Sequence, residues 1–92
     1  MLDKQVHIVV YGKVQGVFFR AYTETKAQEL GICGRVKNLE NGSVDIIAQG
    51  PEESLKRLVE WCHEGPSGAQ VEKVTVDWLK VNGKFLSFHI EY

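Results

Sequence analysis

The composition of this chain is that of an ordinary globular protein, and it excludes several functional classes. With 92 residues the chain is long enough for one compact core and too short for two ordinary domains, so we expect residues 1–92 to form a single domain. Hydrophobic residues make up 43% and charged residues 25% of the chain, which argues against disorder and fibrous repeats. The formal net charge of -1 offers no basic surface for nucleic acid, and no apolar stretch approaches the roughly 20 residues of a membrane helix.

The sequence contains neither a targeting segment nor a metal or redox motif. Residues 1–7 carry charges and lead directly into a strand pattern, without the apolar core of a signal peptide, so we expect a cytoplasmic protein. Cys33 and Cys62 are too few and too far apart for a metal knuckle or a disulfide framework, and we interpret them as reduced thiols. The three histidines stand apart from acids and cysteines at metal-binding spacing, so no metal and no other cofactor is predicted.

The first third of the chain predicts a strand followed by a helix. Apolar and polar residues alternate over residues 6–11, as in a strand with one buried face. Residues 12–16 interrupt this pattern. Residues 21–30 are then rich in helix-forming side chains, and Gly31 is placed to end the helix.

A hairpin and a second helix are predicted next. Two short alternating segments, 36–39 and 44–48, flank Asn41-Gly42, the dipeptide most typical of a tight type I′ turn. Residues 50–53 (GPEE) open a helix with a proline near its first position and acids in its first turn. One apolar stripe at helical spacing faces a core and consists of Leu55, Leu58, Val59 and Cys62.

The last third of the chain predicts two more strands. Residues 65–68 (GPSG) form the only linker-like stretch, which is too short to separate domains. Alternation returns over residues 74–78, and again over residues 86–92 after Asn82-Gly83.

This order of elements predicts an α+β fold, the ferredoxin-like sandwich, with an extra C-terminal strand. Such a fold has an antiparallel sheet with both helices on one face. A right-handed first crossover places the third strand between the first and second, which then run in the same direction about 9.5 Å apart. The end of the first strand, the start of the first helix and the end of the second strand therefore share one edge.

An anion site is predicted where the first strand meets the first helix. Gly12 and Gly16 allow conformations and close approaches that a side chain would forbid, so the amides from Gln15 onward can point inward as a nest. The helix start adds unpaired N–H groups and the positive end of its dipole. Arg20 adds a permanent charge with a planar fork that matches phosphate oxygens.

Asn38 is predicted to share this site. Its alternation matches that of Val36, which we place on the helix-facing side of the sheet, so its amide should point toward the start of the first helix. Each signal also has an ordinary explanation, since glycines serve turns, arginines at helix starts are often solvated, and asparagines bond locally. The loop matches neither the Walker phosphate loop nor the dinucleotide fingerprint.

Two segments resemble the signatures of one protein family. Residues 11–20 read YGKVQGVFFR, which is similar to the first signature of the acylphosphatase family. Residues 34–38 read GRVKN and, with Gly42, Val44 and Gly50, resemble its second signature in residue type and spacing. The likeness extends over essentially the whole chain, whose length is that of the free-standing enzymes.

The resemblance implies a hydrolase that cleaves the carboxyl–phosphate bond of acyl phosphates without metal or organic cofactor. It implies that Asn38 orients the attacking water and that one loop holds the phosphate. The phosphate-binding residues carried over are Gln15, Gly16, Val17, Phe18, Phe19 and Arg20. Inorganic phosphate is then expected as product and competitive inhibitor. We expect a monomer that acts on a small molecule, without nucleic acid or membrane as partner.

Arg35 departs from the family pattern, which usually has an aromatic residue at this position. Its alternation is opposite to that of Val36 and Asn38, so it should lie on the other face of the sheet. We therefore expect Arg35 to affect surface packing or substrate preference rather than the chemical step.

The alternative to an enzyme is a binding module on the same fold. A non-catalytic domain that binds phosphate or acyl phosphate would need Arg20 and the loop, but not Asn38 as a guide for water. An RNA-binding module is disfavoured, because the strands lack the aromatic and basic cluster of the usual stacking motifs. Activity on an acyl phosphate separates the enzyme from the binding domain.

Overall fold

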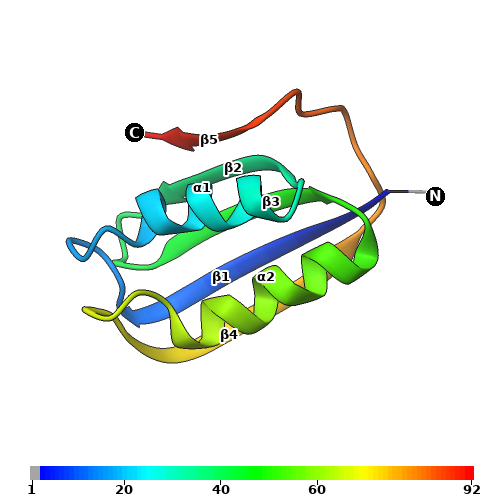
Figure 1. Cartoon of the computed structure of the whole chain (residues 1–92). Helices are drawn as coiled ribbons and strands as arrows, with labels where there is room; N and C mark the ends of the chain where they lie inside the picture. The colour runs from blue at the N-terminus through cyan, green and yellow to red at the C-terminus, as the bar shows by residue number, and fades with distance from the viewer. Residues whose placement is uncertain (1–2) are drawn as a thin grey trace.

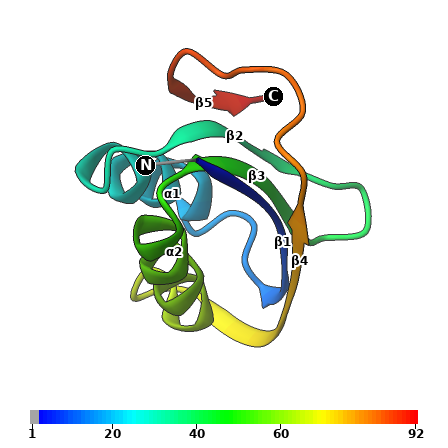
Figure 2. The same ribbon diagram turned by 90° about the vertical axis from the view of Figure 1, so that its right-hand side faces the viewer.

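Five strands and two helices make up the computed structural model of the protein, which describes residues 3–92 (Figure 1). In chain order they are β1 (Lys4–Lys13), α1 (Phe19–Glu29), β2 (Cys33–Asn38), β3 (Val44–Gly50), α2 (Glu52–Glu64), β4 (Gln70–Leu79) and β5 (Phe88–Glu91). The strand order in the sheet is β4-β1-β3-β2-β5, and both helices cover the same face (Figure 2). This is the α+β architecture expected from the sequence.

The strand register brings the ends of β1 and β2 to the same level. Val10 in β1 and Asn38 in β2 both pair with Val44 in the intervening β3. The third strand is therefore inserted as the right-handed crossover predicted. The ends of β1 and β2 are therefore two strand spacings apart, about 9.5 Å, and both lie beside the start of α1.

The prediction of an antiparallel sheet is wrong at one edge. β5 pairs with β2 in parallel, with Ile90 opposite Val36, so the sheet is mixed. Since the chain reverses direction after β4 and β4 runs opposite to β2, the last strand has to run along β2 in the same sense. β5 is also shorter than the alternating segment 86–92.

The type I′ turn predicted between β2 and β3 is also wrong. The Leu39 amide donates to the Ser43 carbonyl oxygen at 2.9 Å, which leaves a loop of residues 40–42. A type I′ turn requires positive φ at both central residues, whereas Gly42 (φ 93°) has positive φ and Asn41 does not. The Asn41 Oδ1 accepts a hydrogen bond from the Ser43 amide at 3.0 Å, which stabilises this three-residue loop.

The core lies between the sheet and the two helices. Val6, Ile8 and Val10 of β1 are fully buried, as their alternation predicted. The stripe of α2 contributes Leu55 and Leu58, also fully buried. Helix α1 begins at Phe19, two residues earlier than predicted, because that ring enters the core. Trp61 packs against it with ring centroids 5.3 Å apart.

The two cysteines form no disulfide, and Cys62 lies in the hydrophobic core. Cys33 and Cys62 are both free, and burial raises the pKa of the Cys62 thiol to about 12. Within residues 3–92, no three His, Cys, Asp or Glu side chains gather as a metal ion would require. Among the helices of this same range, none has the length and apolar character needed to cross a membrane.

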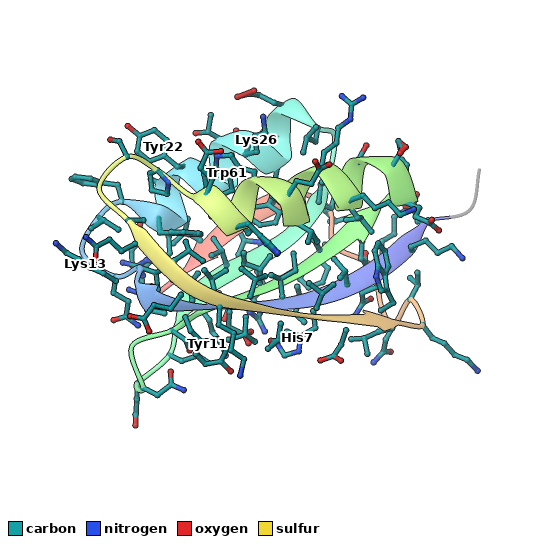
Figure 3. The ribbon with its side chains drawn as sticks, turned by 90° about the horizontal axis from the view of Figure 1, so that it is seen from below. His7, Tyr11, Lys13, Tyr22, Lys26 and Trp61 are labelled. Atoms are coloured by element: carbon teal, nitrogen blue, oxygen red, sulfur yellow. The ribbon has the colours of Figure 1, made fainter. Side chains whose placement is uncertain are left out.

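The face of the sheet without helices carries an ion-pair network centred on Asp45. Its carboxylate contacts His7 Nε2 and Arg35 Nη1, each at 2.6 Å, although it is only 6% exposed. Figure 3 shows His7 on the side of the sheet away from the helices. Burial acts to raise the pKa of Asp45, but the hydrogen bonds to His7 and Arg35 outweigh it and leave that pKa below its usual value.

Asp45→Asn should lower the free energy of unfolding by about 1–3 kcal/mol at neutral pH, because it removes the charge that pairs with Arg35. The pKa of Asp45 is lower in the folded protein than in the unfolded chain. Its carboxylate therefore stabilises the fold fully above about pH 4, and this contribution disappears as the pH falls through the folded pKa. Urea unfolding of both proteins from about pH 7 down to about pH 2 measures the difference.

Asp3→Asn, which changes an exposed carboxyl, is the matched control and should be nearly neutral. A wild-type advantage over Asp45→Asn that grew on acidification would contradict the ion pairing.

Candidate active site

A cavity of about 270 Å³ lies at the edge where β1, β2 and the start of α1 meet. Figure 1 shows this edge with the ends of β2 and β5 beside the first turn of α1. The predicted site residues that line it are Gln15, Gly16, Phe18, Phe19, Arg20 and Asn38. Of the predicted set only Val17 is not among its lining residues, because this side chain packs against the core.

Gly12 and Gly16 shape the loop in different ways. β1 continues through Gly12 with an irregular register toward β4. A Cβ there would lie 2.2 Å from the Gln70 carbonyl oxygen, so only glycine allows the two backbones to approach. At Gly16 a Cβ would meet nothing within 4 Å, but φ is +75°. Gly12 therefore provides close approach, and Gly16 provides backbone conformation.

The backbone from Gly16 to Phe18 contains two residues with positive φ. Gly16 (φ 75°) and Phe18 (φ 62°) both have left-handed backbones, and Val17 between them has negative φ. Left-handed residues of this kind occur in the concave arrays of N–H groups that bind anions, so this backbone is compatible with such an array.

The first turn of α1 leaves its positive end uncompensated. Phe18 occupies the N-cap position and makes no side-chain hydrogen bond, and the first turn contains no acid. α2 differs, because Glu52 and Glu53 lie in its first turn and offset the helix dipole. The cavity therefore faces unpaired N–H groups and a positive dipole end, which favour a bound anion.

The Gln15 side chain fastens the loop to the hairpin after β2. Its Nε2 donates to the Leu39 carbonyl oxygen at 2.8 Å and to the Ser43 carbonyl oxygen at 2.9 Å. Leu39 directly follows Asn38, so these bonds tie the two halves of the site together. The sequence predicted only a role for the backbone amide of Gln15. It did not predict these side-chain hydrogen bonds, because the partners lie 24 and 28 residues away.

Arg20 is held at the cavity by the C-terminal strand. Its Nη1 donates to the Glu91 carbonyl oxygen at 3.4 Å, and its Cζ lies 4.9 Å from the centroid of the Tyr92 ring. Both contacts favour a guanidinium that remains at the cavity rather than in bulk water. No charged partner occupies its fork in the part of the chain that the structure covers, so the fork can bind an anion.

Asn38 and Arg35 lie on opposite faces of β2, as their alternation predicted. Asn38 lines the cavity, while Arg35 bonds to Asp45 on the face without helices. The residue that departs from the family pattern is thus part of the surface network.

The sequence did not predict the other four lining residues: Val14 and Ala21 flank the predicted loop, and Ile90 and Tyr92 come from the C-terminal end of the chain. The alternation of Ile90 and Tyr92 in the last strand showed that they share a face. It contained no signal for the edge of the sheet that this strand joins.

Comparison with known proteins gives one consistent result. The family model for acylphosphatase matches residues 6–90. The chain is 51% identical to an acylphosphatase of Marinobacter nauticus, over 89% of both chains, and 41% identical to one of Pelotomaculum thermopropionicum over the full length of both. The solved structure of an acylphosphatase from Coxiella burnetii superposes with a TM-score of 0.92 at 40% identity, over 97% of this chain and 93% of that one.

This chain belongs to the acylphosphatase family. The resemblance carried by residues 11–20 and 34–38 is confirmed, and so is the ferredoxin-like α+β fold. The roles of the individual site residues stay predictions.

Gln15→Met should reduce both stability and turnover, because it keeps the size of the side chain and removes both donors. Loss of two hydrogen bonds should lower the free energy of unfolding by about 1–2 kcal/mol. Activity should fall further than stability explains, since a loop released from the hairpin no longer holds its geometry. Urea unfolding and steady-state hydrolysis of benzoyl phosphate measure the two effects.

The matched control is Gln28→Met on the exposed side of α1, which should change neither quantity. Full activity in Gln15→Met would show that the loop keeps its geometry without this contact.

Proposed function

We propose that this chain hydrolyses the carboxyl–phosphate bond of acyl phosphates in the cavity at the start of α1. The relatives named acylphosphatase match it along most or all of their length, which supports an enzyme rather than a binding accessory domain. The observation that carries the choice of site is the convergence of the loop 15–20 with Asn38 around one cavity.

Phosphate binding is assigned to the loop and to Arg20. The left-handed backbones at Gly16 and Phe18, together with the uncapped start of α1, support a cradle of amides from Gln15 to Phe19. The Arg20 fork would bind two phosphate oxygens and neutralise the charge that develops on them.

Asn38 is assigned the attacking water. It lies on the sheet side of the cavity, level with Val10 and two strands away, so its amide can hold a water beneath a phosphate bound at the loop. A carboxylate is a good leaving group, so positioning and charge stabilisation suffice without a covalent nucleophile. We assign no general base, and a phosphate oxygen of the substrate accepts the proton.

The remaining parts of the assignment rest on the sequence. We propose that residues 1–92 act as one domain, as a monomer in the cytoplasm, without metal or organic cofactor. Inorganic phosphate, which shares the phosphate oxygens of the substrate, should inhibit competitively.

Arg20→Ala should lower the hydrolysis of benzoyl phosphate by at least about 100- to 1,000-fold, because a preorganised charged donor is lost. The assay includes a chelator. The fold should survive, since the Arg20 contacts lie at the exposed edge of the cavity. Arg57→Ala on the exposed face of α2 controls for loss of a positive charge. Activity of Arg20→Ala within a few-fold of wild type would exclude this cavity as the site.

Asn38→Ala should chiefly lower kcat, with a much smaller change in the inhibition constant of inorganic phosphate. The reason is that Asn38 is assigned to the water and not to the phosphate. Asn82→Ala, at an exposed position beyond β4, is the control. Equal losses in turnover and in phosphate inhibition would show that Asn38 belongs to the cradle.

A further inference from the structure

A second, shallower hollow adjoins the cavity on the outer side of α1. It measures about 350 Å³ and is lined by Phe18, Ala21, Tyr22 and Thr25. Phe18 and Ala21 also line the first cavity, so the two hollows are neighbours that share these two residues. None of the four side chains is charged.

Phe18 has an exposure that core packing does not explain. It is the one non-glycine residue with positive φ among residues 3–92, and a left-handed backbone is unfavourable for a bulky side chain. Phe18 is 76% exposed, so packing in the core does not offset this unfavourable backbone. The neighbouring Phe19 is buried against Trp61 and needs no such explanation.

Tyr22 extends the apolar surface by one helical turn. It lies in the first turn of α1 and lines the same hollow as Phe18, the residue that precedes the helix. Tyr22 is 55% exposed, and Figure 3 shows it projecting from α1 away from the sheet. Two aromatic rings thus stand in solvent beside the mouth of the phosphate cavity.

The direction of the reaction points the acyl group at this hollow. Displacement at phosphorus requires the attacking water and the leaving carboxylate to lie on opposite sides. Asn38 lies on the sheet side of the cavity, and α1 turns Phe19, Thr23 and Ala27 toward the sheet. The hollow at Phe18 and Tyr22 lies on the opposite side of the same helix.

We propose that this hollow binds the acyl substituent of the substrate and selects acyl phosphates with aromatic or other apolar acyl groups over acetyl phosphate. The inference rests on the proposed function. An aromatic acyl group would stack on the two rings, whereas a methyl group is too small to reach both. A charged acyl group would find no partner among the lining side chains.

The test compares kcat/KM for benzoyl phosphate with kcat/KM for acetyl phosphate. Tyr22→Ala should lower the ratio of the two about five- to tenfold, through a higher KM for benzoyl phosphate. Acetyl phosphate hydrolysis and inhibition by inorganic phosphate should stay unchanged. Tyr22→Phe should keep the wild-type ratio, and Leu86→Ala, which removes an 87% exposed side chain outside the hollow, is the control.

Phe18→Gly is a second test. Glycine adopts the left-handed backbone at this position without strain. The same ratio should fall about five- to tenfold, while the free energy of unfolding should not fall. Use of a ratio cancels any damage to the shared phosphate cradle. An unchanged ratio in both Tyr22→Ala and Phe18→Gly would overturn this inference alone. Wild-type protein that hydrolysed neither substrate would overturn the proposed function itself.

Discussion

The site depends on one register constraint, the row of residues that runs from Val10 through Val44 to Asn38. Because β3 lies between β1 and β2, the asparagine is held two strand spacings from the strand that leads into the loop. The start of α1 forms a further wall of the cavity. A site made of loop amides, one guanidinium and one amide can then form without any of these groups entering the core.

Contacts on both sides hold the loop between β1 and α1 in place. Gly12 lets β1 approach the backbone of β4, and Gln15 binds the hairpin that follows β2. Gly16 and Phe18 then hold left-handed backbones between these two fixed points. Amides that are already oriented need no reorganisation when charge develops on a substrate, which is how such a site lowers a barrier.

The two faces of the sheet carry different groups of residues. The helix-facing side builds the core and the cavity. The other side carries the Asp45 network, in which Arg35 pairs with a buried carboxylate, and Arg35 does not line the candidate cavity. Substitutions on the helix-free face are therefore expected to act mainly on stability, and the acyl group is proposed to bind on the outer face of α1.

Local patterns in the sequence determined the fold class and predicted most of the residues that line the candidate cavity. Alternation and helix signals located all seven elements, and the segments 11–20 and 34–38 identified the loop, Arg20 and Asn38, because these signals depend on neighbours along the chain. Only the tertiary structure decided the parallel pairing of β5, the wall formed by Ile90 and Tyr92, and the partners of Gln15. These features join residues at least 24 positions apart, and their geometry depends on which strands pack together rather than on any local preference.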